Sequence, residues 1–223
     1  MAKTKDEGAE LQEAYSKLEQ FLDSNKTLVT TVVTILAIVI LGAVFLKTYY
    51  IPNQEAKAQA EIYKAQYYFS QDSFKLALYG SPELTGFQDI IKSYKFTKAA
   101  NLSKYYAGIS HLNMGNYDDA IKLLKGYNAH DDLTGALAAS AAGDAYMQKG
   151  EVEKGLSQYS KAASIADDEF VAPKILFKAA QAHQKFGEDK QALVYYEKIK
   201  YNYPTSSEGP QVDKYIEAIN GVL

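Results

Sequence analysis

The sequence has no cysteine, no arginine and no tryptophan, and it has only three histidines. Without cysteine the chain forms no disulfides, thiolate metal sites or cysteine nucleophiles. All 24 basic residues are lysine, so no guanidinium group can form bidentate hydrogen bonds to phosphate or guanine. We therefore expect no nucleic-acid binding. No phosphate loop, Ser-His-Asp set or His-Glu-x-x-His motif occurs. We therefore expect no enzyme, cofactor, metal or small-molecule substrate.

The composition is otherwise that of an ordinary globular protein. The 223 residues are 47% hydrophobic and 23% charged, with a net charge of −3. These values exclude a wholly disordered or collagen-like chain, and the length suits one or two domains.

An uncharged apolar run without Asn, Gln or Pro covers Thr27–Leu46. As a helix it would span about 30 Å, the thickness of the hydrocarbon core of a bilayer. We predict a transmembrane helix over 27–47. Residues typical of the membrane interface flank this helix: two lysines, whose ammonium groups can reach the headgroups, and two tyrosines. They are Lys26, Lys47, Tyr49 and Tyr50.

Two alternatives to an anchor are a buried core helix and a cleaved signal peptide. The apolar run is longer than a signal peptide needs, the preceding 26 residues carry four lysines against six acids, and no small-x-small cleavage site follows. We favour an uncleaved anchor. The lysine counts on its two sides nearly balance, but long domains translocate largely regardless of charge, so we expect the amino end inside and the carboxyl end exported.

Residues 1–26 form a predicted cytoplasmic amphipathic leader. Leu11, Tyr15, Leu18 and Leu22 recur at helical spacing. Two interpretations stay open, a helix lying on the inner membrane surface and a docking helix for a membrane partner.

The rest of the chain repeats itself around three turn glycines, Gly115, Gly150 and Gly187. At fixed distances from each glycine stand small residues, ring residues and large apolar residues. The pattern predicts helix pairs in which small residues let two helices approach closely, while each glycine ends a first helix in left-handed backbone. The predicted packing residues are Gly108, Ala120, Gly143, Gly155, Ala180 and Ala192.

These segments resemble the tetratricopeptide repeat, a two-helix module of 34 residues. The resemblance implies an all-α fold, in which one N-terminal transmembrane helix precedes a helical solenoid. Three departures are Lys104, Ala139 and Leu176, at a place where the family usually has tryptophan. We predict a repeat domain over 52–223, divided into a divergent pair 52–97, repeats at about 101–134, 136–169 and 173–206, and a cap helix 209–222.

The resemblance also implies a concave face lined by positions 2, 5, 9 and 12 of each repeat. An apolar groove of this kind accepts an extended peptide or an amphipathic helix. The candidate groove residues are Leu102, Tyr105, Ile109, Leu112, Leu137, Asp144, Met147, Phe177 and Gln181. The alternative is that a helix over Ala56–Tyr79 covers the first of them and makes them core.

The histidines offer little chemistry. His111 and His183 occupy a repeat position usually held by a packing tyrosine, and we expect them to be structural. His130 precedes Asp131 and Asp132 in a predicted loop, where a metal site is a weaker interpretation than a solvated turn.

The layout, together with the stretch KLEQFLDSNKTLVTTVV, resembles the YfgM-type ancillary subunit family of the Sec translocon. That resemblance implies a single-pass protein of the bacterial inner membrane with its repeats in the periplasm. The implied partners are the Sec translocon, a membrane-anchored periplasmic chaperone and emerging polypeptides. Segments such as IKYNYPTSSEGP also resemble outer-membrane biogenesis lipoproteins, so an envelope-assembly scaffold is the alternative function.

Overall fold

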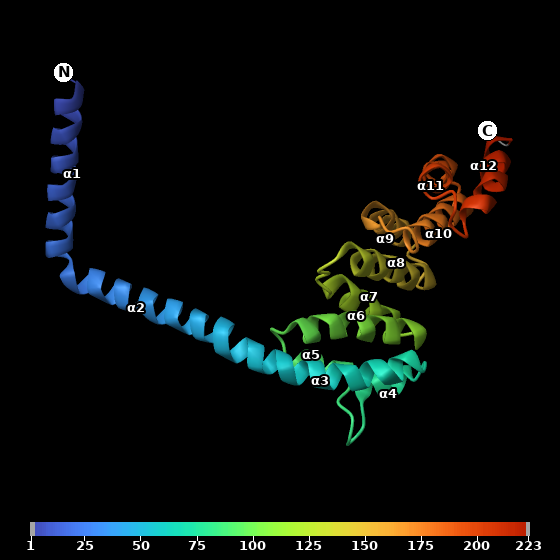
Figure 1. Cartoon of the computed structure of the whole chain (residues 1–223), viewed down its shortest axis with the longest axis horizontal. Coiled ribbons are helices and arrows are strands. Elements are labelled where there is room, and N and C mark those ends of the chain that lie inside the picture. Colours follow the sequence, from blue (N-terminus) through green and yellow to red (C-terminus); the bar gives the residue numbers. More distant parts are fainter. Residues whose placement is uncertain (1–2, 222–223) are drawn as a thin grey trace. The chain divides into compact units, whose positions relative to one another are not determined.

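The computed structural model describes residues 3–221, and it describes side chains from residue 12 onward. The chain divides into two compact units, Met1–Asn53 and Gln54–Leu223. Met1 and Ala2 of the predicted leader, Val222 of the predicted cap helix and the final residue Leu223 lie outside the described residues, as does the side chain of Leu11. Within residues 3–221 the fold is a helical repeat architecture without β-strands, as predicted (Figure 1).

The first unit contains α1 (Lys3–Ser24), α2 (Lys26–Phe45) and the π-helix η1 (Leu46–Tyr50). The α-helix of the anchor therefore gives way to wider turns before the predicted end at residue 47. Asn25 separates α1 from α2, and its side-chain amide donates to the Phe21 carbonyl at 3.0 Å.

The helix α2 satisfies its own polar groups. The hydroxyls of Thr30, Thr31 and Thr34 donate to carbonyls four residues earlier at 2.7 to 2.8 Å. No residue of α2 is buried. A helix that is apolar all round and exposed along nearly its whole length is suited to an apolar solvent such as a bilayer, and it differs from the buried core helix considered as an alternative.

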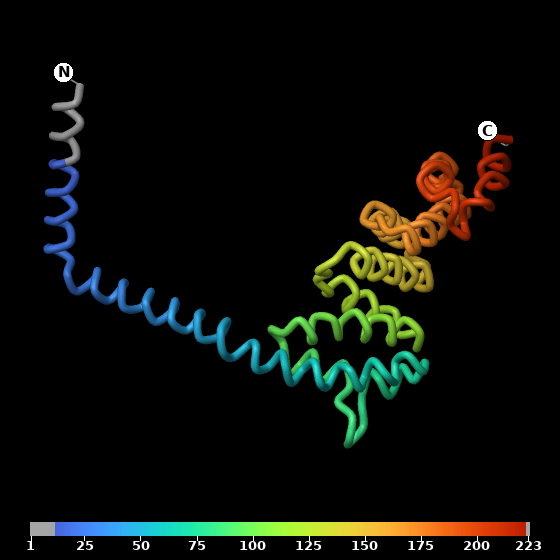
Figure 2. The backbone as a smooth tube through the Cα atoms, viewed as in Figure 1, coloured from blue at the N-terminus to red at the C-terminus, as the bar shows by residue number. Residues whose placement is uncertain are grey.

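The second unit, which begins at Gln54 within α3, is built from helices that follow one another along the chain (Figures 1 and 2). They are α3 (Ile51–Ser70), α4 (Phe74–Tyr79), α5 (Phe87–Ser93), α6 (Lys98–Asn113), α7 (Tyr117–Gly126), α8 (Asp132–Gln148), α9 (Val152–Ile165), α10 (Ala172–Lys185), α11 (Asp189–Asn202), the 3-10 helix η2 (Gly209–Gln211) and α12 (Val212–Asn220). Three antiparallel pairs, α6–α7, α8–α9 and α10–α11, carry the repeat pattern.

The structure has two helices where the sequence predicts one. The predicted helix covers Ala56–Tyr79, but α3 ends at Ser70 and α4 starts at Phe74. Between them Asp72 has φ 54°, a left-handed conformation that Asp tolerates better than most residues. The chain reverses there, so that Ala58 and Ile62 of α3 share a core with Ala77 and Leu78 of α4.

The three turns between paired helices have the same geometry, as the spacing of their glycines predicts. Gly115, Gly150 and Gly187 have φ of 78°, 76° and 78°. In each turn the amide of the residue after the glycine donates to the carbonyl five positions earlier, at 2.9 to 3.0 Å. This is the Schellman motif, in which glycine adopts the left-handed conformation without a steric cost.

The core runs through the unit as three successive clusters. The first is shared by α3, α4, α5 and α6, the second by α7 and α8 with part of α6, and the third by α8 to α12. Side-chain caps fix where α6 begins. Thr97 accepts from the Ala100 amide at 3.0 Å, and the Glu55 carboxylate accepts from the Ala99 amide at 3.1 Å, so α6 starts at Lys98 instead of near Asn101.

Candidate partner-binding site

The first helices of the three pairs are neighbours, because α6 contacts α8 and α8 contacts α10. The residues predicted to line a groove lie on these three helices. Gln181 is exposed, and the other eight are partly exposed. Each therefore has some surface open to a partner.

The four candidates on α6 divide between two cores. Leu102 packs against the cluster formed by α3 to α6. Tyr105, Ile109 and Leu112 pack against the cluster of α7 and α8. Leu102 therefore packs against the core to which α3 and α4 contribute, whereas the cluster of α7 and α8 supports the other three.

Tyr105 lies within a group of rings. Its ring centroid is 5.3 Å from that of Tyr106 and 5.6 Å from that of Tyr127. Burial, and then the neighbouring Tyr106 and Tyr127, raise the pKa of Tyr105 above its usual value. The phenol is neutral at physiological pH, so this part of the face offers aromatic surface and hydroxyls without charge.

Asp144 is engaged inside the fold. Its carboxylate accepts from the Tyr159 hydroxyl at 2.6 Å and from Lys178 Nζ at 2.6 Å, which joins α8 to α9 and α10. Burial, and then this hydrogen bond to Asp144, raise the pKa of the Tyr159 phenol far above its usual range. The sequence pattern gave Asp144 a groove position but not these two partners.

Phe177 and Met147 also have internal neighbours. The Phe177 ring meets Tyr196 and Tyr215 edge-on, with centroids 5.8 Å and 5.3 Å apart. Met147 lies over Gly155, where an added Cβ would be 2.9 Å from its side-chain atoms. At this end of the face the cap helix α12 supplies Tyr215 and so limits how far a groove could extend.

The six small residues predicted to pack between helices are all buried. A Cβ added at Gly108 would lie 2.6 Å from Leu124 Cγ, and one added at Gly143 would lie 2.7 Å from two ring carbons of Tyr159. These distances are shorter than van der Waals contact, so the helices approach closely at these glycines.

The residues predicted for the membrane interface lie at the two ends of α2. Lys26 is its first residue, with Nζ 3.3 Å from Asp23, and Lys47, Tyr49 and Tyr50 lie in η1. All four are exposed.

The two histidines on the repeat position are buried among polar neighbours. His183 Nε2 lies 3.0 Å from Ser160 Oγ, and its Nδ1 lies 2.7 Å from Glu188 Oε2. The ring nitrogens of His111 lie 3.4 Å from the side-chain amides of Gln88 and Asn116. His130 is exposed, and Asp131 caps α8 by accepting from the Thr134 amide at 2.7 Å. No cluster of three possible metal ligands occurs among the described residues.

His111 gives a prediction about stability and pH. Burial lowers its pKa below the usual value, and the nearby Asp119 opposes this only in part. The unfolded state therefore binds a proton more readily than the folded state. His111 then stabilises the fold fully above about pH 6.5, and this contribution is lost as the pH falls below that value. We expect the melting temperature to fall between pH 7.5 and 5.5, and to fall less in His111→Gln. Equal slopes for the two proteins would contradict this assignment.

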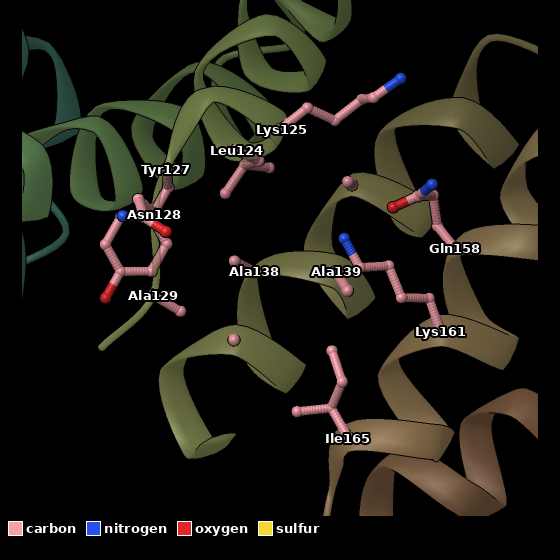
Figure 3. Close-up of a pocket in the computed structure, with 12 residues that line it drawn as sticks. Leu124, Lys125, Tyr127, Asn128, Ala129, Ala138, Ala139, Gln158, Lys161 and Ile165 are labelled. Atoms are coloured by element: carbon pink, nitrogen blue, oxygen red, sulfur yellow. The ribbon is translucent and has the colours of Figure 1, made fainter. Parts of the chain in front are cut away.

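A cavity of about 310 Å³ lies between α7, α8 and α9 (Figure 3). Small residues of α8 form its floor, and they are Gly135, Ala138, Ala139 and Ala142. Lys125 and Lys161 lie at its rim. Sequence reasoning did not select these residues. The signal that could have found them is the run of small residues in α8 at places where α10 has Ile175 and Leu176.

Comparison with protein families gives a match for two of the three pairs. The family model described as tetratricopeptide repeat matches residues 103–129 and 175–206. The chain contains tetratricopeptide repeats. The first match falls on α6 and α7 and the second on α10 and α11. The pair α8–α9 lies between them and has the same turn geometry. A search of curated proteins found no match.

Two coarse conclusions follow. Repeats of this family mediate protein–protein interaction and are typically non-catalytic, so the chain has the fold of an interaction module. Within residues 3–221 one helical stretch, which includes α2, is long and apolar enough to cross a membrane.

Proposed function

We propose that this protein is a membrane-anchored adaptor that acts as an accessory subunit of the Sec translocon. It would bind emerging polypeptides and a membrane-anchored periplasmic chaperone. The observation that carries the proposal is the joint presence of tetratricopeptide repeats and one N-terminal helix suited to a bilayer. The translocon assignment rests on the resemblance of the layout to the YfgM-type family.

The proposed location is the inner membrane of a bacterium, with the leader in the cytoplasm and the repeats in the periplasm. The helix α2 supports the anchor, because its threonine hydroxyls are satisfied within the helix and lysines and tyrosines flank its ends. Long domains translocate with little regard to flanking charge, which supports an exported repeat domain.

The proposed contact surface is the face shared by α6, α8 and α10. Its α6 end presents partly exposed apolar and aromatic side chains, Tyr105, Ile109 and Leu112. Its α10 end is more polar at Gln181, and Asp144 pairs with Lys178 in between. An amphipathic helix or extended segment fits such a surface, with its apolar side chains toward α6.

Cross-linking in native membranes tests this function. The natural chain lacks cysteine, so a single cysteine at Leu112 or Gln181 carries the reagent without background. We expect adducts with the translocon channel, the chaperone or arriving chains. A cysteine at Ser157, exposed on α9, is the matched control and should give far fewer. Adducts with outer-membrane assembly proteins and none with the channel would favour the alternative scaffold and overturn the translocon assignment.

A further inference from the structure

The cavity between α7, α8 and α9 is a feature of one repeat interface. Its 12 lining residues include none of the candidate groove residues on α6, α8 and α10. The floor comes from α8, and the two sides come from α7 and α9, the second helices of successive pairs (Figure 3). The site is therefore separate from the proposed contact surface, and it does not depend on that proposal.

The repeat pattern explains why this interface is hollow. Aligned on their turn glycines, Ala138 and Ala139 of α8 correspond to Ile175 and Leu176 of α10. Ile175 is 5% exposed and Leu176 is fully buried, so at the next interface large side chains fill the equivalent space. Two alanines leave the space open where two larger side chains would close it.

The charged side chains at the rim are all positive. Lys125 of α7 and Lys161 of α9 both line the cavity. The Lys161 side chain reaches toward Ala139 with the amide of Gln158 beside it, and the Lys125 side chain extends away from the alanine floor (Figure 3). No acidic residue lines the cavity. Among the described residues neither lysine forms an ion pair. Lys125 Nζ donates a long hydrogen bond to the Tyr146 hydroxyl at 3.5 Å. Neither ammonium group is thus neutralised by a carboxylate of the chain.

We infer that this cavity binds an acidic segment of a partner polypeptide. One apolar side chain of the segment would enter over Ala138, Ala139 and Ala142, and carboxylates on either side would pair with Lys125 and Lys161. Charge complementarity selects an anion, and the apolar floor selects a side chain next to it. The volume of about 310 Å³ is at the lower limit for a small-molecule pocket and accommodates a single anchoring side chain.

The test measures fluorescence anisotropy with the full chain in neutral phosphatidylcholine nanodiscs. The probe is a pool of dye-labelled nonapeptides with Leu, Ile, Phe or Met at the centre and Asp or Glu at four other positions. A second pool carries Asn and Gln in place of the acids. We expect the acidic pool to bind at least about tenfold more tightly, since charge-assisted hydrogen bonds to two lysines contribute that much or more.

Two double variants probe the two halves of the site. Lys125→Gln with Lys161→Gln should weaken binding of the acidic pool about tenfold. Ala138→Ile with Ala139→Leu installs the residues of α10 and should abolish binding while the melting temperature is kept or raised. The matched control, Lys75→Gln with Lys122→Gln, removes the same charge from exposed positions on α4 and α7 and should change the affinity less than twofold.

Several results would overturn the inference. They are no binding of the acidic pool, equal binding of both pools, wild-type affinity in the lysine pair, or an equal loss in the control pair. If dodecanoate binds with a dependence on Lys125 and Lys161 while the peptides do not, the ligand is a fatty anion and not a polypeptide. Should the filled variant fail to fold, the lysine pair still decides the outcome.

Discussion

Replacing Gly143 by leucine should markedly destabilise the repeat unit. A Cβ at this position would lie 2.7 Å from Cδ1 and Cε1 of Tyr159 and 3.3 Å from the Gly155 carbonyl oxygen. Tyr159 cannot easily move aside, because it is 5% exposed and its hydroxyl donates to Asp144. The two helices α8 and α9 would have to separate.

The expected size follows from overpacking in a closely packed core. Such insertions cost about 1–3 kcal/mol. For a domain of this size each kcal/mol lowers the melting temperature by about 2–4 °C, so we expect a fall of about 2–12 °C. Calorimetry or circular dichroism of the purified chain measures it.

Gly126→Leu is the matched control, since it makes the same chemical change in α7. No atom lies within 4 Å of a Cβ added at Gly126. This control should change the free energy of unfolding by less than about 1 kcal/mol, because it alters helix propensity without a clash. If the two leucine variants melt at the same temperature, Gly143 has no packing role.

Placing two lysines in the middle of α2 should release the chain from the membrane. In Ile35→Lys with Val39→Lys each charge at the centre of the helix costs about 2.5–3.5 kcal/mol, so the pair costs about 5–7 kcal/mol. Wild-type protein should stay in the membrane pellet after alkaline carbonate extraction. The double variant should move largely to the supernatant or be degraded.

A second pair of lysines at the ends of the helix separates position from charge. Thr27→Lys with Thr48→Lys adds the same two charges where the side chains can reach the headgroups. This pair should remain in the pellet. Retention of the central pair at the wild-type level would mean that α2 does not lie across the hydrocarbon core.

Local rules were enough to predict much of the helical architecture. A glycine closing each first helix, with small residues at fixed distances from it, specifies a turn whose hydrogen bonds lie within six residues, and the structure has that turn at Gly115, Gly150 and Gly187. The apolar run of α2 can also be recognised as a candidate membrane span from its composition and length alone. Where local signals competed, prediction was less accurate, as at Asp72, whose left-handed backbone divides the helix expected over Ala56–Tyr79.

Side-chain partners across helices were not predictable in the same way. Their positions within a repeat assigned Asp144 and Phe177 to a groove. They did not predict the hydrogen bonds of Asp144 with Tyr159 and Lys178, or the contact of Phe177 with Tyr215 of the cap helix. These partners are 15 to 38 residues away along the chain, and their meeting depends on how each pair stacks on the next.

By itself the sequence determined that this protein is all-helical, repeated, free of arginine and cysteine, and equipped with one stretch suited to a bilayer. These properties follow from composition and from periodicities shorter than one helix pair. Only the tertiary structure decided which small residues close an interface and which leave it open. The ring of Tyr159 fills the space beside Gly143, whereas Ala138 and Ala139 leave a cavity that Lys125 and Lys161 also line. The physical reason is that a small residue creates space, and whether that space is filled depends on the side chains that other helices bring to it.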